Sequence, residues 1–128
     1  MRFILSLLLF ISLEARHVEW MGDYEKAHQR ALKENKQLMV LLVQKGNPTC
    51  QELIPEVFMN QEYIEMINKK FISVLVTKDQ KSSYPIELLY TLTYPAVFFL
   101  NKYELFSCEP IDGDITPKLL EKHLKSCF

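Results

Sequence analysis

The sequence predicts an α/β domain in which helices cover both faces of a central mixed β-sheet. Three predominantly apolar runs, at residues 38–43, 71–76 and 96–100, lack the alternation of half-exposed strands and are typical of strands that are covered on both faces. Segments with the apolar spacing of helices lie between these runs, which is the order of a layered α/β fold. The chain of 128 residues is long enough for one compact domain with a buried core.

The first helix is expected from Tyr24 to about Asn35, after an entry loop that contains Trp20. Asp23 is the expected cap, because its side-chain oxygen can accept one of the amides that a first helical turn leaves free. Five residues of this segment recur at the spacing of one helix face, which we expect to point toward the sheet. This inward face consists of Tyr24, Ala27, His28, Ala31 and Leu32.

A second capped helix is expected directly after the first apolar run. Residues 44–46 form a loop, and Asn47 is a strong N-cap residue. Pro48 then occupies the first helical position, where its missing N–H costs nothing. The helix continues through residues 49–58, and another helical segment follows at residues 61–69.

The second half of the chain is expected to supply the remaining strands. Pro85 opens a short helix at residues 86–90, before the third apolar run. Residues 101–104 form a turn into a strand at residues 105–111, so that the two strands make a hairpin.

The last helix is expected to begin at Pro117, with Thr116 as its cap, and to end at Cys127. The expected order along the chain is therefore helix, strand, helix, strand, helix, strand, strand and helix. This order favours a mixed sheet between two helical layers.

Residues 1–15 are predicted to form a signal peptide. Arg2 gives a positive start, and residues 3–13 are apolar apart from two serines. A run of this length is typical of a secretory signal and is shorter than the ~20 residues that a membrane-spanning helix needs. Ala15 suits a cleavage site. The alternatives are an uncleaved signal anchor and a buried N-terminal strand or helix. Residues 16–128 then form the folded domain.

Charge and cysteine content exclude several classes of function. The formal net charge is −1, and lysines and arginines are scattered, so no basic patch indicates nucleic-acid binding. The sequence has no Cys-x-x-Cys and no pair of histidines at ligand spacing, so neither a metal site nor a cofactor is expected.

The three cysteines are an odd number, which in an exported protein implies one pair and a free thiol, or a bond to another molecule. A strand from Cys108 to Gly113 spans about 16 Å at ~3.3 Å per residue. A helix from Pro117 to Cys127 returns about 15 Å at ~1.5 Å per residue. We therefore predict a Cys108–Cys127 disulfide that leaves Cys50 as the odd thiol. Two separate reduced cysteines are the alternative.

With this order of elements, residues 18–127 resemble the thioredoxin-like family, and especially its small exported members that begin with a tryptophan and a long first helix. Trp20 and the helix after it resemble the family's opening helix, and the strand at residues 38–43 resembles the strand that leads to the redox site. Residues 48–53 resemble the end of the redox motif, and residues 94–99 resemble the strand that the family enters through a cis-proline. The resemblance implies a thioredoxin-like three-layer sandwich.

The resemblance breaks down at one position of the redox motif. The family's Cys-x-x-Cys is here Asn47-Pro48-Thr49-Cys50, so the attacking cysteine is an asparagine. In the family the first cysteine attacks a substrate disulfide and the second resolves the mixed disulfide. Asn47 cannot attack, although it can still cap the helix. Cys50 is then either a single-thiol nucleophile or a buried structural residue that remained after activity was lost.

The resemblance also implies a groove for a substrate peptide. A cis-proline leaves backbone groups exposed beside the redox helix, where an extended peptide can pair like an added strand. The expected groove residues are Asn47, Pro48, Thr49, Tyr94 and Pro95. A trans-proline at the start of an edge strand is the alternative. Such a groove needs no cysteine.

Two functions therefore remain open. The first is an exported, periplasmic redox protein that works through Cys50 alone and is not an efficient dithiol reductase. The second is a non-catalytic module that binds peptides or proteins in the groove. The expected partners of this monomeric domain are protein or peptide thiols and disulfides, and it contacts a membrane only if the signal segment is kept as an anchor. His28 and His123 are expected at the edge of the core, and no sequence feature places a histidine beside Cys50 for hydrolytic chemistry.

Overall fold

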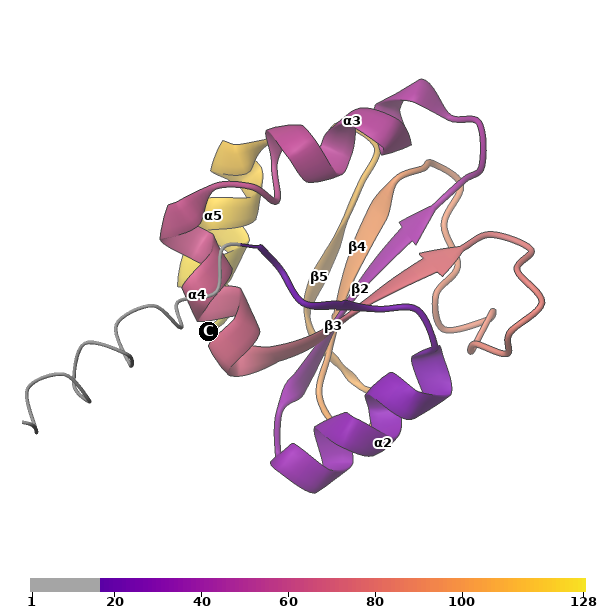
Figure 1. The fold of residues 1–128 in the computed structure, drawn as a ribbon, viewed down its shortest axis with the longest axis vertical. Helices are drawn as coiled ribbons and strands as arrows, with labels where there is room; N and C mark the ends of the chain where they lie inside the picture. The colour runs from indigo at the N-terminus through magenta and orange to yellow at the C-terminus, as the bar shows by residue number, and fades with distance from the viewer. Residues whose placement is uncertain (1–16) are drawn as a thin grey trace, which may run out of the picture.

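The computed structural model describes residues 17–128, so the predicted signal segment lies outside the described residues. The described elements are, in order, β1 (Trp20–Met21), α2 (Tyr24–Glu34), β2 (Gln37–Val43), α3 (Pro48–Glu56), α4 (Gln61–Lys70), β3 (Phe71–Thr77), β4 (Ala96–Leu100), β5 (Phe106–Asp112) and α5 (Pro117–Cys127). Figure 1 shows the sheet between the helices.

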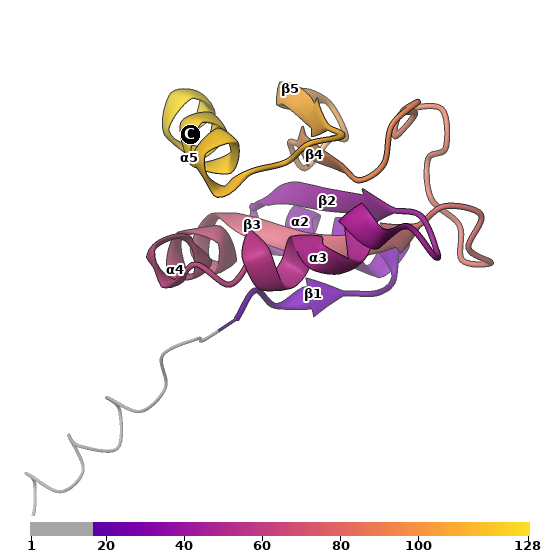
Figure 2. The same cartoon turned by 90° about the horizontal axis from the view of Figure 1, so that it is seen from above.

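The five strands form one mixed sheet in the order β1-β3-β2-β4-β5. Strands β1 and β2 both run parallel to β3, whereas β4 runs antiparallel to β2 and β5 antiparallel to β4. Figure 2 shows β1 and β5 at the two sides of this arrangement. The mixed sheet that the apolar runs predict is therefore confirmed, and β2 and β4 are covered on both faces because apolar clusters lie above and below the sheet.

Two apolar clusters fill the space above and below the sheet. On one face Leu53 of α3, Ile64 of α4 and Leu120 of α5 pack with Met39 and Phe99 of the sheet. On the other face, α2 packs with the alternate strand residues, and the loop between β3 and β4 adds one buried side chain. This second cluster includes Tyr24, Ala27, Ala31, Leu38, Val40, Leu42, Leu89 and Phe98. The three-layer α/β sandwich expected from the sequence is thus the observed fold.

The capping residues define where the helices begin. The Asp23 carboxylate accepts the Lys26 N–H at 3.1 Å, and the Thr116 hydroxyl accepts the Leu119 N–H at 3.1 Å. Both helices therefore start where the sequence predicts, since these side chains satisfy amides that the first turn leaves free. On the first helix, however, Leu32 was wrongly assigned to the inward face, because its side chain is 45% exposed.

The predicted helix at residues 86–90 is wrong. The segment makes only a single helical hydrogen bond, from the Leu89 N–H to the Pro85 carbonyl. Leu89 is buried, whereas Ile86 and Tyr90 are 64% and 67% exposed. A segment this short gains too little from one buried side chain to offset the unfavourable nucleation of a helix.

The remaining differences concern the edges of the sheet. Trp20 and Met21 form the short strand β1 rather than an entry loop, because they pair with Ser73 and Val74 of β3. A strand of two residues has no apolar periodicity that a sequence could reveal. The predicted hairpin is present, and β5 begins at Phe106, one residue later than expected.

Candidate functional site

The candidate site begins with the loop that joins β2 to α3. Asn47 caps α3, and its side-chain oxygen accepts the N–H groups of Thr49 at 3.0 Å and of Cys50 at 3.3 Å. The Asn47 side-chain amide also donates to the Gln44 side-chain oxygen at 3.4 Å. The predicted cap is therefore present with Pro48 at the first helical position, and one asparagine holds both the loop and the helix start.

Cys50 lies in the first turn of α3 with its side chain turned into the protein. The residue is only 8% exposed, and it is the free cysteine of the described chain. Its Sγ lies 3.5 Å from the Gln44 backbone nitrogen, whose N–H points at the sulfur. The positive end of a helix dipole and an N–H donor to the sulfur are features that stabilise cysteine thiolates in proteins. Burial restricts the approach of a partner, so electrostatics and access oppose each other at this sulfur.

Tyr94 and Pro95 lie at the same end of the sheet as Cys50. Ala96 pairs with Leu42 near the end of β2, which places Pro95 level with Val43, directly before the loop that contacts the Cys50 sulfur. The Tyr94–Pro95 peptide bond is cis. Pro95 is buried, and its carbonyl accepts the Gly113 N–H at 2.8 Å. The structure therefore brings the Asn47–Cys50 segment and the Tyr94–Pro95 segment to the same end of the sheet.

The rim of the site, formed by Pro48, Thr49 and Tyr94, is more exposed than Cys50. Pro48 and Thr49 are exposed, and Tyr94 is half-buried. The Lys78 ammonium lies 5.4 Å from the centre of the Tyr94 ring, and the Lys78 N–H donates to the Val43 carbonyl at 2.8 Å. Lys78 thus ties the β3–β4 loop to the end of β2, and a positive charge stands beside the site.

A hollow of about 320 Å³ adjoins Tyr94 on the β3–β4 loop. Its walls include Ile86, Tyr90 and Leu92, whose side chains are 64%, 67% and 83% exposed. Sequence reasoning missed this surface because it expected a helix there. The sequence does contain a signal for this surface. Apolar residues are frequent between Tyr84 and Tyr94, although their spacing has neither the periodicity of a strand nor that of a helix.

The other two cysteines meet elsewhere in the fold. Cys108 and Cys127 form a disulfide, with Cα atoms 5.8 Å apart. Cys108 pairs with Phe99, and Phe99 pairs with Met39, four residues before the end of β2. Four strand residues span about 13 Å at ~3.3 Å per residue, so this disulfide is remote from the end of the sheet where Cys50 lies.

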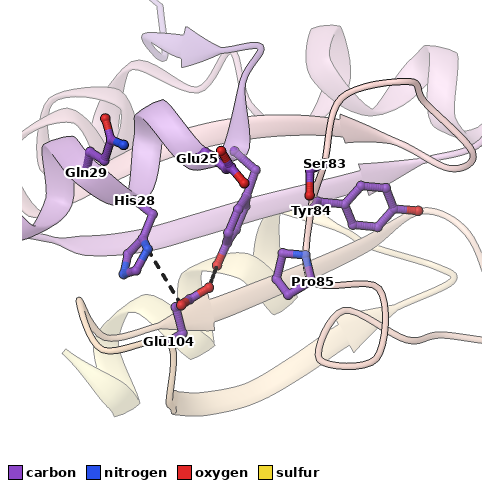
Figure 3. A pocket seen from close by; sticks show the side chains of 8 residues that line it. Glu25, His28, Gln29, Ser83, Tyr84, Pro85 and Glu104 are labelled. Carbon is purple, nitrogen blue, oxygen red and sulfur yellow. Dashed lines mark hydrogen bonds and ion pairs between the residues drawn. The ribbon is translucent and has the colours of Figure 1, made fainter.

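A polar network that the sequence did not indicate joins α2 to the turn between β4 and β5. The Tyr24 hydroxyl donates to the Glu104 carboxylate at 2.7 Å, and His28 Nδ1 lies 3.6 Å from the same carboxylate. Figure 3 shows His28 and Glu104 facing each other at a hollow that Tyr84 and Pro85 border from the opposite side, and Tyr24 lines the same hollow. Burial, and then the hydrogen bond to Glu104, raise the pKa of Tyr24 well above its usual range. This network holds the hairpin against the helix.

Glu104 has a backbone φ of 65°, in the left-handed region that glycine adopts without cost. The turn from Asn101 to Glu104 contains no glycine, so a residue with a side chain adopts this conformation. His28, expected at the edge of the core, is half-buried, and its Nε2 lies 2.8 Å from the Lys102 carbonyl.

Within residues 17–128, no cluster of three or more histidine, cysteine or carboxylate side chains is arranged to hold a metal ion. The same residues contain no helix that is both long and apolar enough to cross a membrane.

A five-stranded mixed sheet, a cysteine in the first turn of the helix after β2 and a cis-proline before β4 are the features of a thioredoxin-like domain. The family model described as "Thioredoxin-like" matches residues 19–102, and the chain belongs to this family. No curated protein sequence matches the chain.

Solved structures share the fold at low sequence identity. A structure described as "DsbH Oxidoreductase" is 15% identical, with a TM-score of 0.66 over 90% of each chain. A putative disulphide-isomerase from Bacteroides thetaiotaomicron is 21% identical, with a TM-score of 0.69 over 85% of this chain and 92% of that chain. A thioredoxin from Thermus thermophilus is 17% identical, with a TM-score of 0.69 over 85% of each chain. At these identities the likeness establishes the fold.

Proposed function

We propose that this chain is an exported thiol–disulfide exchange protein that works through the single thiol of Cys50 and is not an efficient dithiol reductase. The observation that carries the proposal is the environment of the sulfur. Cys50 lies in the first turn of α3, and the Gln44 N–H points at its Sγ from 3.5 Å. The helix start and this donor stabilise the thiolate, which is the form that attacks a disulfide.

The exchange proceeds in two balanced steps. The Cys50 thiolate attacks one sulfur of a partner disulfide, which forms a mixed disulfide and releases the other partner sulfur as a thiolate. Asn47 stands where a second cysteine would complete the reaction within the molecule. An external thiol, from a small molecule or a protein, must therefore attack the mixed disulfide and release Cys50.

Burial of Cys50 favours a second candidate function, a non-catalytic binding module. The thiol is 8% exposed, whereas Pro48 and Thr49 on the rim are exposed. A partner peptide can contact this rim and the half-buried Tyr94 without reaching the sulfur. In this alternative Cys50 serves as a small apolar residue beneath the groove.

Alkylation of the folded protein separates the two functions. The Cys50 thiol should react with a small thiol reagent in native buffer, and Cys50→Ser should abolish the reaction. With a partner extract from the exported compartment, wild type should form mixed disulfides that Cys50→Ser lacks. A thiol that reacts only after unfolding would leave the binding module as the function.

An insulin-reduction assay tests whether a single thiol makes the protein a poor dithiol reductase. Wild type should be near background, and Asn47→Cys should raise the rate because it creates a Cys-Pro-Thr-Cys dithiol. Asn47→Ser is the matched control, since serine also caps a helix and adds no sulfur. Turnover by wild type without an added thiol would contradict the proposal.

Export is supported by two features. Residues 3–13 are apolar apart from two serines, and Cys108 and Cys127 form a disulfide, which persists in oxidising compartments. Residues 1–16 fused to a phosphatase that is active only outside the cytoplasm should give activity. N-terminal sequencing of the mature protein would distinguish cleavage after Ala15 from an uncleaved anchor. Charged residues placed within the apolar run should retain the fusion in the cytoplasm.

A further inference from the structure

We infer that the hollow beside His28 and Glu104 binds the head group of an organic cation, an alkylammonium or a guanidinium. The hollow has a volume of about 360 Å³, and the residues that line it come from α2, the β3–β4 loop and the turn after β4 (Figure 3). Pockets that hold small ligands in proteins have volumes of this order. Glu104 follows β4 and Pro95 precedes it, so the length of that strand separates the hollow from the Cys50 site. The inference is therefore independent of the function proposed for Cys50.

The hydrogen bonds of His28 define which of its ring nitrogens carries the hydrogen. Nε2 lies 2.8 Å from the Lys102 carbonyl, which only accepts, so Nε2 is the donor. The neutral ring then presents the lone pair of Nδ1 to the Glu104 carboxylate, 3.6 Å away. In the part of the chain that the structure describes, no N–H or O–H group donates to Nδ1. Two acceptors thus face each other, and a ligand that donates to both would stabilise them.

The charge of the hollow favours a cation over a neutral donor. Glu25 lines the hollow together with Glu104, and among residues 17–128 no lysine or arginine does. Lys102 is close to Glu104 in the sequence, but its ammonium donates to the Asn35 side-chain oxygen at 2.8 Å. With His28 neutral, the lining therefore carries the charge of two carboxylates. The Glu104 side chain is 34% exposed, so water screens its charge only in part.

Tyr24 holds the Glu104 carboxylate in place for a ligand. The Tyr24 hydroxyl donates to Oε2 at 2.7 Å, whereas Oε1 is the oxygen that faces His28. Burial, and then this hydrogen bond, keep the pKa of Tyr24 well above its usual range, so the hydroxyl remains a donor. Oε1 keeps its lone pairs for a second donor. Pro85 borders the hollow from the opposite side and offers an apolar surface to the alkyl part of a ligand (Figure 3).

Alkylammonium and guanidinium groups meet these requirements. Each has several N–H groups, so that one can donate to Glu104 Oε1 and another to His28 Nδ1. Each is also positively charged, and hydrogen bonds between charged groups are stronger than those between neutral groups. The same head groups occur on free amines and on the lysine and arginine side chains of polypeptides, so the chemistry of the hollow suits both sources.

The test compares charged and neutral probes of similar shape. Isotope-labelled protein is titrated with methylguanidinium against methylurea, and with butylammonium against butanol, while NMR follows the backbone amides. The cations should give saturable shifts at Tyr24, His28 and Glu104, and the neutral probes should give none there. Equal shifts from a cation and its neutral counterpart would overturn the cation site.

A capped peptide that contains one lysine distinguishes the two sources. Tighter binding of this peptide than of butylammonium would identify a polypeptide as the ligand. Binding that is no tighter would identify a free amine, because the residues around the lysine then contribute nothing. A peptide and a butylammonium that both fail to shift these amides would overturn the site for alkylammonium groups.

Three substitutions test the residues. Glu104→Gln keeps the shape of the side chain and removes its charge, so it should weaken methylguanidinium binding by about tenfold or more, the scale of one charge-assisted hydrogen bond. Glu87→Gln is the matched control, because Glu87 is exposed on the β3–β4 loop and does not line the hollow. Tyr24→Phe loosens the same network but keeps both carboxylates, so it should still bind. Equal affinities of the Glu104→Gln and Glu87→Gln variants would overturn the role of Glu104.

A proton on His28 should compete with the ligand. Acid pH protonates histidine, and a proton on Nδ1 pairs with Glu104 in place of the ligand N–H. The other titratable side chains that line the hollow are Tyr24, Glu25, Tyr84 and Glu104. Methylguanidinium should therefore bind more weakly at about pH 5.5 than at about pH 8, and His28→Asn should reduce this difference. The same pH dependence in wild type and His28→Asn would overturn the role of His28 as an acceptor.

Discussion

The two sulfur sites of this protein differ in almost every respect that governs thiol chemistry. Cys50 is 8% exposed and lies at the start of a helix, where the backbone favours a thiolate. Cys127 is exposed and lies at the end of a helix, where the backbone disfavours one. The first site has suitable electrostatics and poor access, and the second has access and a preformed disulfide. This protein thus separates stabilisation of a thiolate from access to a reactive sulfur, two requirements that a Cys-x-x-Cys motif combines.

The largest expected effect comes from the core beneath the disulfide. Phe99 is fully buried and contacts the rings of Phe71, His123 and Phe128. Phe99→Ala should lower the free energy of unfolding by about 3–5 kcal/mol, because a large buried ring leaves a cavity. Urea unfolding of the oxidised protein measures the change. A loss below about 1 kcal/mol would mean that α5 does not pack on β4 as described.

Removal of the disulfide should have the next largest effect on stability. Cys108 and Cys127 are 19 residues apart. Closing a loop of this size restrains the unfolded chain, so loss of the bond should lower the free energy of unfolding by about 3 kcal/mol. The double variant Cys108→Ser/Cys127→Ser should therefore have a lower urea midpoint, with its circular dichroism spectrum preserved by the Phe128 contacts. Cys50→Ser is the control that removes a sulfur and no covalent bond. An unfolded double variant would contradict the anchoring of α5.

The Tyr24 network should give a smaller effect that depends on pH. Tyr24→Phe removes the hydrogen bond to Glu104 and should cost about 1.5 kcal/mol at neutral pH, the scale of a hydrogen bond to a charged group. The pKa of Tyr24 is raised in the folded state above the ~10 of an unfolded chain, first by burial and then by Glu104. Its contribution is therefore fully present below about pH 10 and is lost as the pH rises toward the folded pKa.

Urea titrations at pH 7 and above pH 10 measure this dependence. Wild type should lose more stability between the two pH values than Tyr24→Phe does. Tyr90→Phe is the matched control, because Tyr90 is 67% exposed and should change neither value. Parallel pH profiles for wild type and Tyr24→Phe would show that the network does not join the hairpin to α2.

The smallest expected effect on stability is at the Cys50 helix. Asn47→Ala should lower the free energy of unfolding by about 1 kcal/mol, the usual contribution of an N-cap, and should speed alkylation of Cys50 because it frees the loop that covers the sulfur. Asn60→Ala is the matched control, since Asn60 caps α4 through the Glu62 N–H and lies away from Cys50. It should lower stability to a similar extent without changing the alkylation rate. Equal alkylation rates for both variants would mean that Asn47 does not control access.

Local signals in the sequence determined most of the fold. Asp23, Asn47 and Thr116 mark the starts of three helices, because a side-chain acceptor beside free amides is a requirement of the first turn alone. The apolar runs marked β2, β3 and β4, since a strand that is covered on both faces has few polar residues. The pairing of Cys108 with Cys127 followed from the lengths of one strand and one helix.

Tertiary contacts decided the rest. Whether residues 86–90 form a helix depends on what their side chains can bury, and only Leu89 reaches the core deeply. Strand β1 exists because the edge of β3 offers partners to Trp20, which no feature of residues 20–21 reveals. The Tyr24–Glu104 contact joins residues 80 positions apart in the sequence, and the burial of Cys50 depends on the loop that folds over it. The sequence by itself therefore determined where the elements begin and which residues could react, whereas the packing of distant segments decided which of those residues a partner can reach.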